Sequence, residues 1–473
     1  MARPIRAAPC SWAFLLLFGL LLSCAGAARA LPGHGDEAAV GPTVRLLAQY
    51  LAIDTTNPPG NEMTTARFLQ GIIASAGLET RLFDLGNGRA NLYARLPGDG
   101  SRRPVVLLHH MDVVPADTRF WTVPPFSGRL AGGRLYGRGA IDMKTMGIVE
   151  LQAMLELARS GKRLPRDLIY LAVADEEEGS LGAKAFLRDH ADLVRDAEFL
   201  INEGQTILAD GQGRVKRYLV AVGEKTNLWL DLVFRGPTGH GSLPLAGSAI
   251  ERLGQAAERL RARPPGFRVS PAIRDYLDLL LADVDVTRLP GHQADLGSSL
   301  ANPLFLRAIA ANPRIRASLQ DTISLTRLRA GDKINTIPNE AVLGLDCRLL
   351  PGTDPGRFLA DLRRLLRDLD VEIRVVDTPA VATTSFSPAD SAFMNALRET
   401  AARFDPGVPV TPVLLLSTTD SVFFRAQGIH CYGFEPYALT EAEYDLAHGN
   451  DESFPVAQLD RAVARLVDLL SRL

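Results

Sequence analysis

The chain has 473 residues, of which 47% are hydrophobic and 22% are charged, a composition typical of a globular protein with two or more domains. Its formal net charge is −2, and it becomes −5 when the three arginines of residues 1–30 are left out (−2 − 3). A mildly acidic chain without basic clusters is a poor candidate for nucleic-acid binding.

Residues 1–30 are predicted to be a signal peptide. Two arginines precede an apolar run over residues 12–22, and Ala-Arg-Ala at 28–30 offers a cleavage site between small residues. The run is too short for a comfortable membrane span. The segment around Cys24 also resembles a bacterial lipoprotein box, in which Cys24 would carry a lipid anchor. Both interpretations export the protein, as a periplasmic or secreted protein or as a membrane-anchored lipoprotein.

Strand and helix patterns alternate through residues 31–223. Buried or short strands are expected at 80–83, 91–95, 104–109, 168–174 and 198–201, and helices at 44–51, 63–76, 143–160 and 183–189. This alternation predicts an α/β domain with a mixed, largely parallel sheet.

The pattern changes after residue 223. Strands are expected at 228–234, 322–327, 340–348 and 371–376, helices at 249–260 and 355–369, and an irregular insertion at 264–320. The order β-α-β-β-α-β is ferredoxin-like, and residues 224–377 are interpreted as an inserted α+β domain. The first domain resumes over 378–473, with a helix at 391–403, strands at 413–416 and 430–434, and a closing helix that has Pro455 in its first turn.

Three metal-capable side chains follow predicted buried strands. His110, Glu176 and Glu203 each come just after the end of a separate strand. In open α/β sheets ligands bind at this edge, so we expect the three side chains to converge. Asp112 lies two residues after His110 and in extended backbone would point the same way, where its carboxylate can accept the spare ring N–H of His110.

Further candidates are Asp142, Glu177 and His448. Imidazole and carboxylate ligands without thiolates suit Zn²⁺, Co²⁺ or Mn²⁺. So many ligands fit two metal ions that share one carboxylate. Of the adjacent acids Glu176 and Glu177, one can ligate a metal while the other remains free as a base.

Together these motifs resemble the M20 family of metallo-aminoacylases and carboxypeptidases, and most closely its carboxypeptidase S and secreted N-acyl-amino-acid hydrolase branch. The matching blocks occur in the family's order. They are 110–115 (His-Met-Asp-Val-Val-Pro), 137–144 (Gly-Arg-Gly-Ala-Ile-Asp-Met-Lys), 175–179 (Asp-Glu-Glu-Glu-Gly), 202–204 (Asn-Glu-Gly), 239–242 (Gly-His-Gly-Ser), 335–338 (Asn-Thr-Ile-Pro), 346–348 (Asp-Cys-Arg) and 448–452 (His-Gly-Asn-Asp-Glu). One departure is that Thr145 and Met146 follow Lys144, where the family often has glycines.

The resemblance implies the metal ligands. Asp142 would bridge two zinc ions, with His110 and Glu203 completing one site and Glu177 and His448 the other.

The resemblance also implies that residues 31–223 and 378–473 form the catalytic domain, that residues 224–377 form a lid or dimerisation domain, and which residues act in catalysis and substrate binding. Glu176 would be the general base and Asp112 would orient His110. From the inserted domain, His240 would stabilise the oxyanion after lid closure or from a partner subunit, and Arg348 and Asn335 would bind a substrate carboxylate.

The sequence therefore predicts an exported di-zinc amidohydrolase that cleaves N-acyl amino acids or the C-terminal residues of short peptides. An aminopeptidase or dipeptidase on the same scaffold is the alternative.

Overall fold

The computed structural model describes residues 41–282, 284–377 and 385–473. The predicted signal peptide and Cys24 lie outside the described residues. In the described part of the chain, no helix has both the length and the apolar character needed to cross a bilayer.

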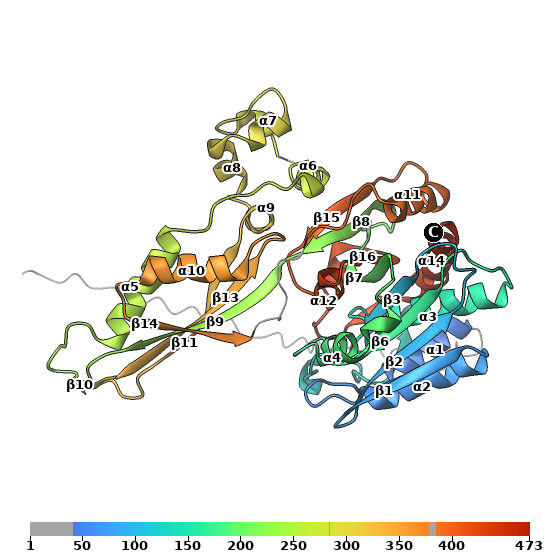
Figure 1. The fold of residues 1–473 in the computed structure, drawn as a ribbon, viewed down its shortest axis with the longest axis horizontal. Helices are drawn as coiled ribbons and strands as arrows, with labels where there is room; N and C mark the ends of the chain where they lie inside the picture. Colours follow the sequence, from blue (N-terminus) through green and yellow to red (C-terminus); the bar gives the residue numbers. More distant parts are fainter. Residues whose placement is uncertain (1–40, 283, 378–384) are drawn as a thin grey trace, which may run out of the picture. The chain divides into compact units, whose positions relative to one another are not determined.

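An eight-stranded mixed sheet forms the largest layer of the fold (Figure 1). In spatial order its strands are β1 (Glu79–Gly86), β2 (Arg89–Leu96), β6 (Leu168–Val173), β3 (Val105–His110), β7 (Phe199–Ala209), β16 (His430–Leu439), β8 (Val215–Glu224) and β15 (Val410–Leu415). The central pairs β6–β3, β3–β7 and β7–β16 are parallel, as is β8–β15, whereas β1–β2 and β2–β6 are antiparallel. The predicted mixed, largely parallel sheet is confirmed.

Helices cover both faces of this sheet. In β3, Val105 and Leu107 belong to one hydrophobic cluster, and Val106 and Leu108 to another, because successive side chains of a strand point to opposite faces. The first cluster includes apolar residues of α1 (Pro42–Leu51), α2 (Glu62–Ser75), α3 (Lys144–Arg159), α11 (Ala392–Phe404) and α14 (Leu459–Arg472). The second includes residues of α4 (Leu181–His190) and α12 (Ser421–Ala426). Burial on both faces explains the continuous apolar runs of the central strands.

Three candidate ligands were expected at strand ends, and the structure places two of them there. Strand β3 ends at His110, and β6 ends three residues before Glu176. The prediction for Glu203 is wrong, because β7 continues to Ala209 and Glu203 lies within it. The strand continues because it keeps its partner β16 across a register shift and then pairs with β8, which the sequence patterns did not predict.

A small three-stranded sheet contains strands that are close in sequence to the candidate ligands Asp142 and His448. It contains β4 (Arg129–Ala131), β5 (Arg134–Tyr136) and β17 (Ser453–Pro455). Pro455 is therefore the last residue of a strand and not part of the closing helix, which begins at Leu459. The remaining short elements of this half are η2 (Thr118–Phe120), η3 (Ala191–Leu193), α13 (Glu441–Tyr444) and η6 (Val456–Gln458).

Residues 226–377 form a second, four-stranded sheet, and we call this part the small-sheet segment. Its strands, in spatial order, are β11 (Thr322–Ala330), β13 (Glu340–Leu349), β9 (Thr226–Arg235) and β14 (Val371–Asp377), all antiparallel. Helices α5 (Ala249–Ala262) and α10 (Pro355–Leu366) share a hydrophobic cluster with this sheet. The expected β-α-β-β-α-β order is present. The domain boundaries at 223/224 and 377/378 stay a prediction.

The stretch between α5 and β11 consists of short helices, as the irregular pattern indicated. They are η4 (Pro271–Ile273), α6 (Arg274–Leu280), η5 (Val286–Arg288), α7 (Leu296–Leu300), α8 (Pro303–Ile309) and α9 (Pro313–Leu319). Asn302 and Asn312 cap α8 and α9, each followed by a proline at the first helical position. A two-stranded ladder of β10 (Gly239–His240) and β12 (Thr336–Ile337) completes the small-sheet segment.

Candidate metal centre

The six candidate ligand side chains meet beside the end of β3. Two groups of three have ligand atoms within 4.8 Å of one another: His110 with Asp142 and Glu177, and His110 with Glu176 and Glu203. His448 joins them through Asp142 and Glu177. These residues come from β3, β7 and three connecting segments, so only the folded chain brings them together.

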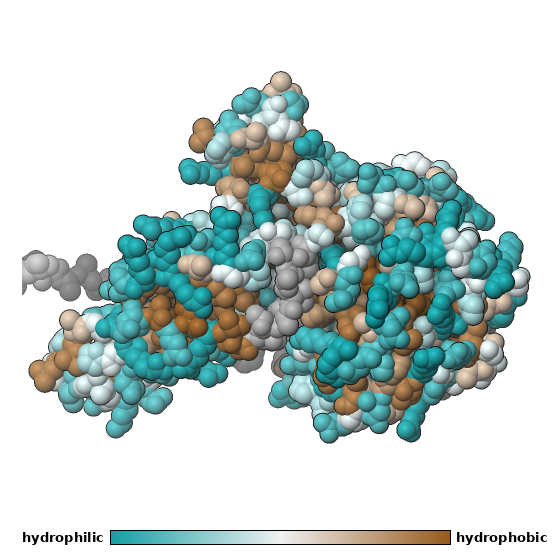
Figure 2. Space-filling view, in the orientation of Figure 1, coloured by the Kyte–Doolittle hydropathy of each residue, from teal (hydrophilic) through white to brown (hydrophobic). Residues whose placement is uncertain are grey.

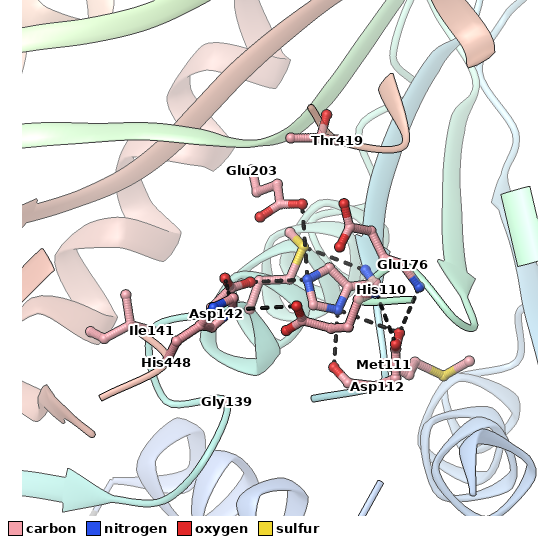
Figure 3. Close-up of polar contacts among 12 residues, drawn as sticks. His110, Met111, Asp112, Gly139, Ile141, Asp142, Glu176, Glu203, Thr419 and His448 are labelled. Carbon is pink, nitrogen blue, oxygen red and sulfur yellow. Dashed lines mark hydrogen bonds and ion pairs between the residues drawn. The ribbon is translucent and has the colours of Figure 1, made fainter. Parts of the chain in front are cut away.

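Asp142 lies between the two imidazoles (Figure 3). Its Oδ1 is 3.0 Å from Nε2 of His110, and its Oδ2 is 3.1 Å from Nε2 of His448. Burial favours the neutral acid, but contacts with both histidines lower the pKa of Asp142 well below its usual value. One ionised carboxylate therefore faces a histidine with each oxygen, which is the arrangement expected of a bridging ligand.

His110 is buried and held from its other ring nitrogen. Nδ1 lies 3.0 Å from the backbone oxygen of Asp112 and 3.6 Å from its carboxylate oxygen Oδ1. The sequence led us to expect the carboxylate as acceptor, but β3 ends at His110 and the i, i+2 rule for strands no longer applies at Asp112. Nε2 faces Asp142 at 3.0 Å and Glu203 at 3.9 Å, and a proton held on Nδ1 would leave Nε2 free to bind a cation placed among them. Burial lowers the pKa of His110, but its contacts with Asp112 and Asp142 raise that pKa well above 6.5.

The Asp112 carboxylate instead holds the turn that carries the adjacent acids. Its Oδ1 accepts the backbone N–H of Glu176 at 3.0 Å, and its Oδ2 accepts that of Glu177 at 3.1 Å. Oδ2 also accepts from Nδ2 of Asn57 at 2.8 Å. Burial acts to raise the pKa of Asp112, but contact with His110, followed by the hydrogen bonds from Asn57 and Glu176, lowers it below its usual value. The motif predicted His110 as the partner of Asp112, whereas in the structure the Asp112 carboxylate also holds the turn through the backbone N–H groups of Glu176 and Glu177.

The side chains of this turn point to different neighbours. Glu177 Oε2 lies 3.3 Å from Nε2 of His448, while its buried Oε1 has no hydrogen-bond partner. Contacts with Asp142 and Glu177 raise the pKa of the half-exposed His448 to about 10. Burial, followed by the charge of Glu203, raises the pKa of Glu176 well above its usual value.

These residues fit two divalent cations. Burial and neighbouring acids raise the pKa values of Glu176, Glu177 and Glu203, because ionised carboxylates repel one another here, and bound cations would relieve that repulsion. The orphaned Oε1 of Glu177 is a further free ligand atom. Carboxylate and imidazole donors suit Zn²⁺, Co²⁺ and Mn²⁺. Because Glu176 also lies within ligand reach of His110 and Glu203, its assignment as base stays a prediction.

Arg348 lines a cavity that also includes the acidic turn. The cavity has a volume of about 210 Å³, and its walls include Glu176, Glu177, Trp229, Thr418 and Arg348. The guanidinium is already paired with Asp346, at 2.8 Å from Nε to Oδ1 and 3.1 Å from Nη2 to Oδ2. Nη1 donates to Asn227. A substrate carboxylate would therefore meet an arginine that is fixed in place and partly neutralised.

The structure does not bring His240 and Asn335 to the cluster. His240 lies in the β10–β12 ladder and Asn335 directly precedes β12, where the Gly241 N–H donates to the Asn335 carbonyl at 2.8 Å. The His240 ring contacts Ser242, with 2.7 Å between Nδ1 and Oγ. Both residues are exposed, and they are flanked by the exposed apolar side chains of Leu243 and Ile334. In Figure 2 apolar surface gathers at this β10 tip, at the left of the view.

Sequence reasoning assigned no role to Glu452 and Arg138, although both stand in the quoted motifs. They form a buried ion pair beside Asp142 and His448, with 2.7 Å between Arg138 Nη1 and Glu452 Oε2. The only signal for Glu452 in the sequence was a charged residue within a predicted loop. The main-chain groups that Glu452 binds are more than 300 residues away in sequence, so no local pattern indicates them.

Comparisons with known proteins identify the family of this chain. The family model described as "Peptidase family M20/M25/M40" matches residues 106–472. The N-fatty-acyl-amino acid synthase/hydrolase PM20D1 of Homo sapiens is 30% identical over 388 residues, covering 80% of this chain and 76% of that protein. Aminoacylase-1 of Sus scrofa is 26% identical, covering 91% and 95%. The M20 family metallo-carboxypeptidase Sso-CP2 of Sulfolobus solfataricus has the same fold, with a TM-score of 0.71 at 21% identity, covering 91% of this chain and 99% of that chain.

Proposed function

This chain belongs to peptidase family M20/M25/M40 and is a hydrolase of that family, and on this premise we propose that it cleaves the amide bond of N-acyl amino acids or of the C-terminal residue of short peptides. The proposed centre holds two divalent cations, with Zn²⁺ the first candidate. Asp142 would bridge them, His110 and Glu203 would complete one site, and Glu177 and His448 would complete the other. The observation that carries the proposal is the placement of Asp142 between the two imidazoles.

The proposed chemistry is hydrolysis by a water molecule that Glu176 deprotonates. Bound divalent cations would supply the acidity that activates this water and would polarise the amide carbonyl. Glu176 lies within reach of the proposed centre, where a carboxylate can take a proton from water and pass it to the leaving amine. Asp112 fixes the backbone of Glu176, so the base is held by main-chain contacts.

The proposed substrate carries a free carboxylate, which Arg348 binds. The N–H groups that Asp346 and Asn227 leave unused remain available to it, and the fixed guanidinium loses little freedom on binding. The cavity volume of about 210 Å³ suits one amino-acid residue better than a long chain.

His240 and Asn335 are proposed to act after closure of the small-sheet segment or from a second copy of the chain in a homodimer. The imidazole would donate to the developing oxyanion and the amide would bind the substrate carboxylate. The exposed Leu243 and Ile334 beside them are consistent with a tip that becomes covered.

We also propose that the protein is exported to the periplasm or beyond it, with residues 1–30 cleaved or Cys24 lipidated. An aminopeptidase or dipeptidase is the second candidate function, because it needs the same centre and differs in the substrate terminus that it recognises.

The test is a substrate panel together with metal analysis. The purified protein should contain about two divalent cations per chain and should hydrolyse N-acyl amino acids faster than dipeptides with a free amine. Glu176→Gln should abolish hydrolysis without loss of metal, and Glu178→Gln, which changes an adjacent acid given no role here, is the matched control. Full activity after removal of the metal would refute the mechanism, and a preference for free dipeptides would favour the second candidate.

A further inference from the structure

We infer that the buried ion pair of Arg138 and Glu452 is a positioning device that sets the bridging Asp142 and the ligand His448 in place before metal binds. We call this pair the Arg138–Glu452 clamp. The inference rests on the proposed metal centre, because positioning has meaning only if these two residues are ligands. Neither Arg138 nor Glu452 is itself proposed to bind a cation.

Glu452 collects the main-chain N–H groups of the turn that ends in Asp142. Its Oε1 accepts from Ile141 at 2.6 Å and from Asp142 at 3.2 Å. Its Oε2 accepts from Gly139 at 3.0 Å and from Nη1 of Arg138 at 2.7 Å. The carboxylate is completely buried, so these four donors replace its entire hydration. The direction of the Asp142 backbone is therefore set by Glu452.

Gly139 allows the turn to fold around that carboxylate. Its φ is +89°, and a Cβ at this position would lie 2.8 Å from a methyl carbon of Val113. A side chain would therefore both strain the backbone and clash with its neighbour. The tight turn and its N–H groups exist only around a small residue.

Arg138 connects the same ion pair to the second ligand. While Nη1 binds Glu452, Nη2 donates to the backbone oxygen of His448 at 3.2 Å. His448 has a φ of +61°, a conformation that non-glycine residues adopt rarely and that surrounding contacts must hold. The guanidinium also lies over the Trp121 ring, 5.2 Å from its centroid. Arg138 thus binds the backbone of His448 directly and is linked to the backbone of Asp142 through Glu452.

Preorganisation of this kind predicts a measurable effect on metal affinity. Without the clamp, Asp142 and His448 must be ordered by the cation itself, and that cost reduces affinity. Outer-sphere partners of metal ligands typically change metal affinity 10–100-fold when they are mutated. Because Asp142 is shared, both cations should be weakened and not one alone.

The experiment titrates metal-free protein with Zn²⁺ by calorimetry. Glu452→Gln keeps the side-chain shape but turns an NH₂ group toward main-chain donors, and it should weaken both Zn²⁺ sites at least tenfold. It should also shift the visible absorption of the Co²⁺-loaded protein. The matched control is Asp405→Asn, which breaks another buried ion pair, with Arg465 (2.8 Å), and should lower the melting temperature without changing Zn²⁺ affinity.

The outcomes separate the inference from the proposed function. Wild-type protein that binds no Zn²⁺ would refute the proposed centre. Wild-type binding with unchanged Zn²⁺ affinity and Co²⁺ spectrum in Glu452→Gln would overturn the clamp alone.

A second measurement does not depend on the variant folding. In metal-free wild-type protein, the amides of Ile141 and Asp142 should exchange hydrogen at least tenfold more slowly than the exposed turn at Gly132. Protection that appears only after Zn²⁺ is added would show that the metal orders the turn, and would overturn the inference.

Discussion

Asp112→Asn separates two roles that the sequence motif combines in one residue. The local motif suggests that the carboxylate orients His110, whereas the structure places the backbone oxygen nearer to that ring (3.0 Å against 3.6 Å). The variant keeps its backbone oxygen. We therefore expect it to retain both metals while it loses control of Glu176.

The contacts of Asp112 fix the size of the effect. Asparagine can leave its oxygen at Oδ2, where it still accepts from Asn57 and Glu177, and must then place its NH₂ at Oδ1 against the N–H of Glu176. A buried donor left without an acceptor costs about 1–3 kcal/mol, so the free energy of unfolding should fall by about 2 kcal/mol. If the same misplacement affects the base during catalysis, kcat falls about 30-fold.

The assay combines urea denaturation, metal analysis and steady-state kinetics on one preparation of each protein. Asp84→Asn is the control, because that exposed aspartate accepts one main-chain N–H at a turn in β1, far in sequence from the site. Loss of one metal from Asp112→Asn with an unchanged kcat per remaining active molecule would refute the reasoning, since it would make the carboxylate the group that holds His110.

Three further predictions follow from the same contacts. Chelation should abolish hydrolysis, and added Zn²⁺ should restore it with circular dichroism unchanged, whereas activity in metal-free protein would contradict the centre. Arg348→Lys should raise KM for carboxylate substrates at least tenfold with a smaller change in kcat, while Arg327→Lys, which alters a more exposed arginine paired with Asp231 on the same sheet, should not. Burial lowers the pKa of Lys225 from 10.5 to about 8, so between these values the unfolded chain holds a proton that the folded chain has released, and the free energy of unfolding rises with pH. Lys225→Met should remove up to about 3 kcal/mol of that rise, as measured by urea denaturation at pH 7.5 and 10.5, and an identical pH dependence in the variant would contradict the shift.

The sequence predicted best those elements whose signal is local. The apolar runs of β3 and β6 mark strands buried on both faces, and they place His110 and the acidic turn at one edge of the sheet. The helices of the small-sheet segment were equally visible from their spacing. In each case the residues that decide the structure are neighbours in sequence.

The errors arose where distant pairing decides the structure. Glu203 and Gly204 look like a strand end, but β7 continues because β16 and β8 supply partners from elsewhere in the chain. Proline is acceptable in the first turn of a helix, but Pro455 pairs with β5 and is therefore part of strand β17. Asp112 was assigned by a rule for strands, but it lies two residues beyond the end of β3, where that rule no longer applies.

The same contrast explains the two carboxylates that hold the site. Asp112 and Glu452 each capture the N–H groups of a turn that carries candidate ligands, and the chain distance between carboxylate and turn is 64 residues in one case and about 310 in the other. Carboxylates suit this task because one group can accept several N–H bonds and direct them to a single point. Ionised acids in a cluster repel one another, and a carboxylate that binds only the main chain of the turn does not compete with a cation for the oxygens of the candidate ligands. The residues that make such a centre rigid, here Asp112 and Glu452, therefore differ from those proposed to bind metal. Only the proposed ligands can be recognised in the sequence from their residue types.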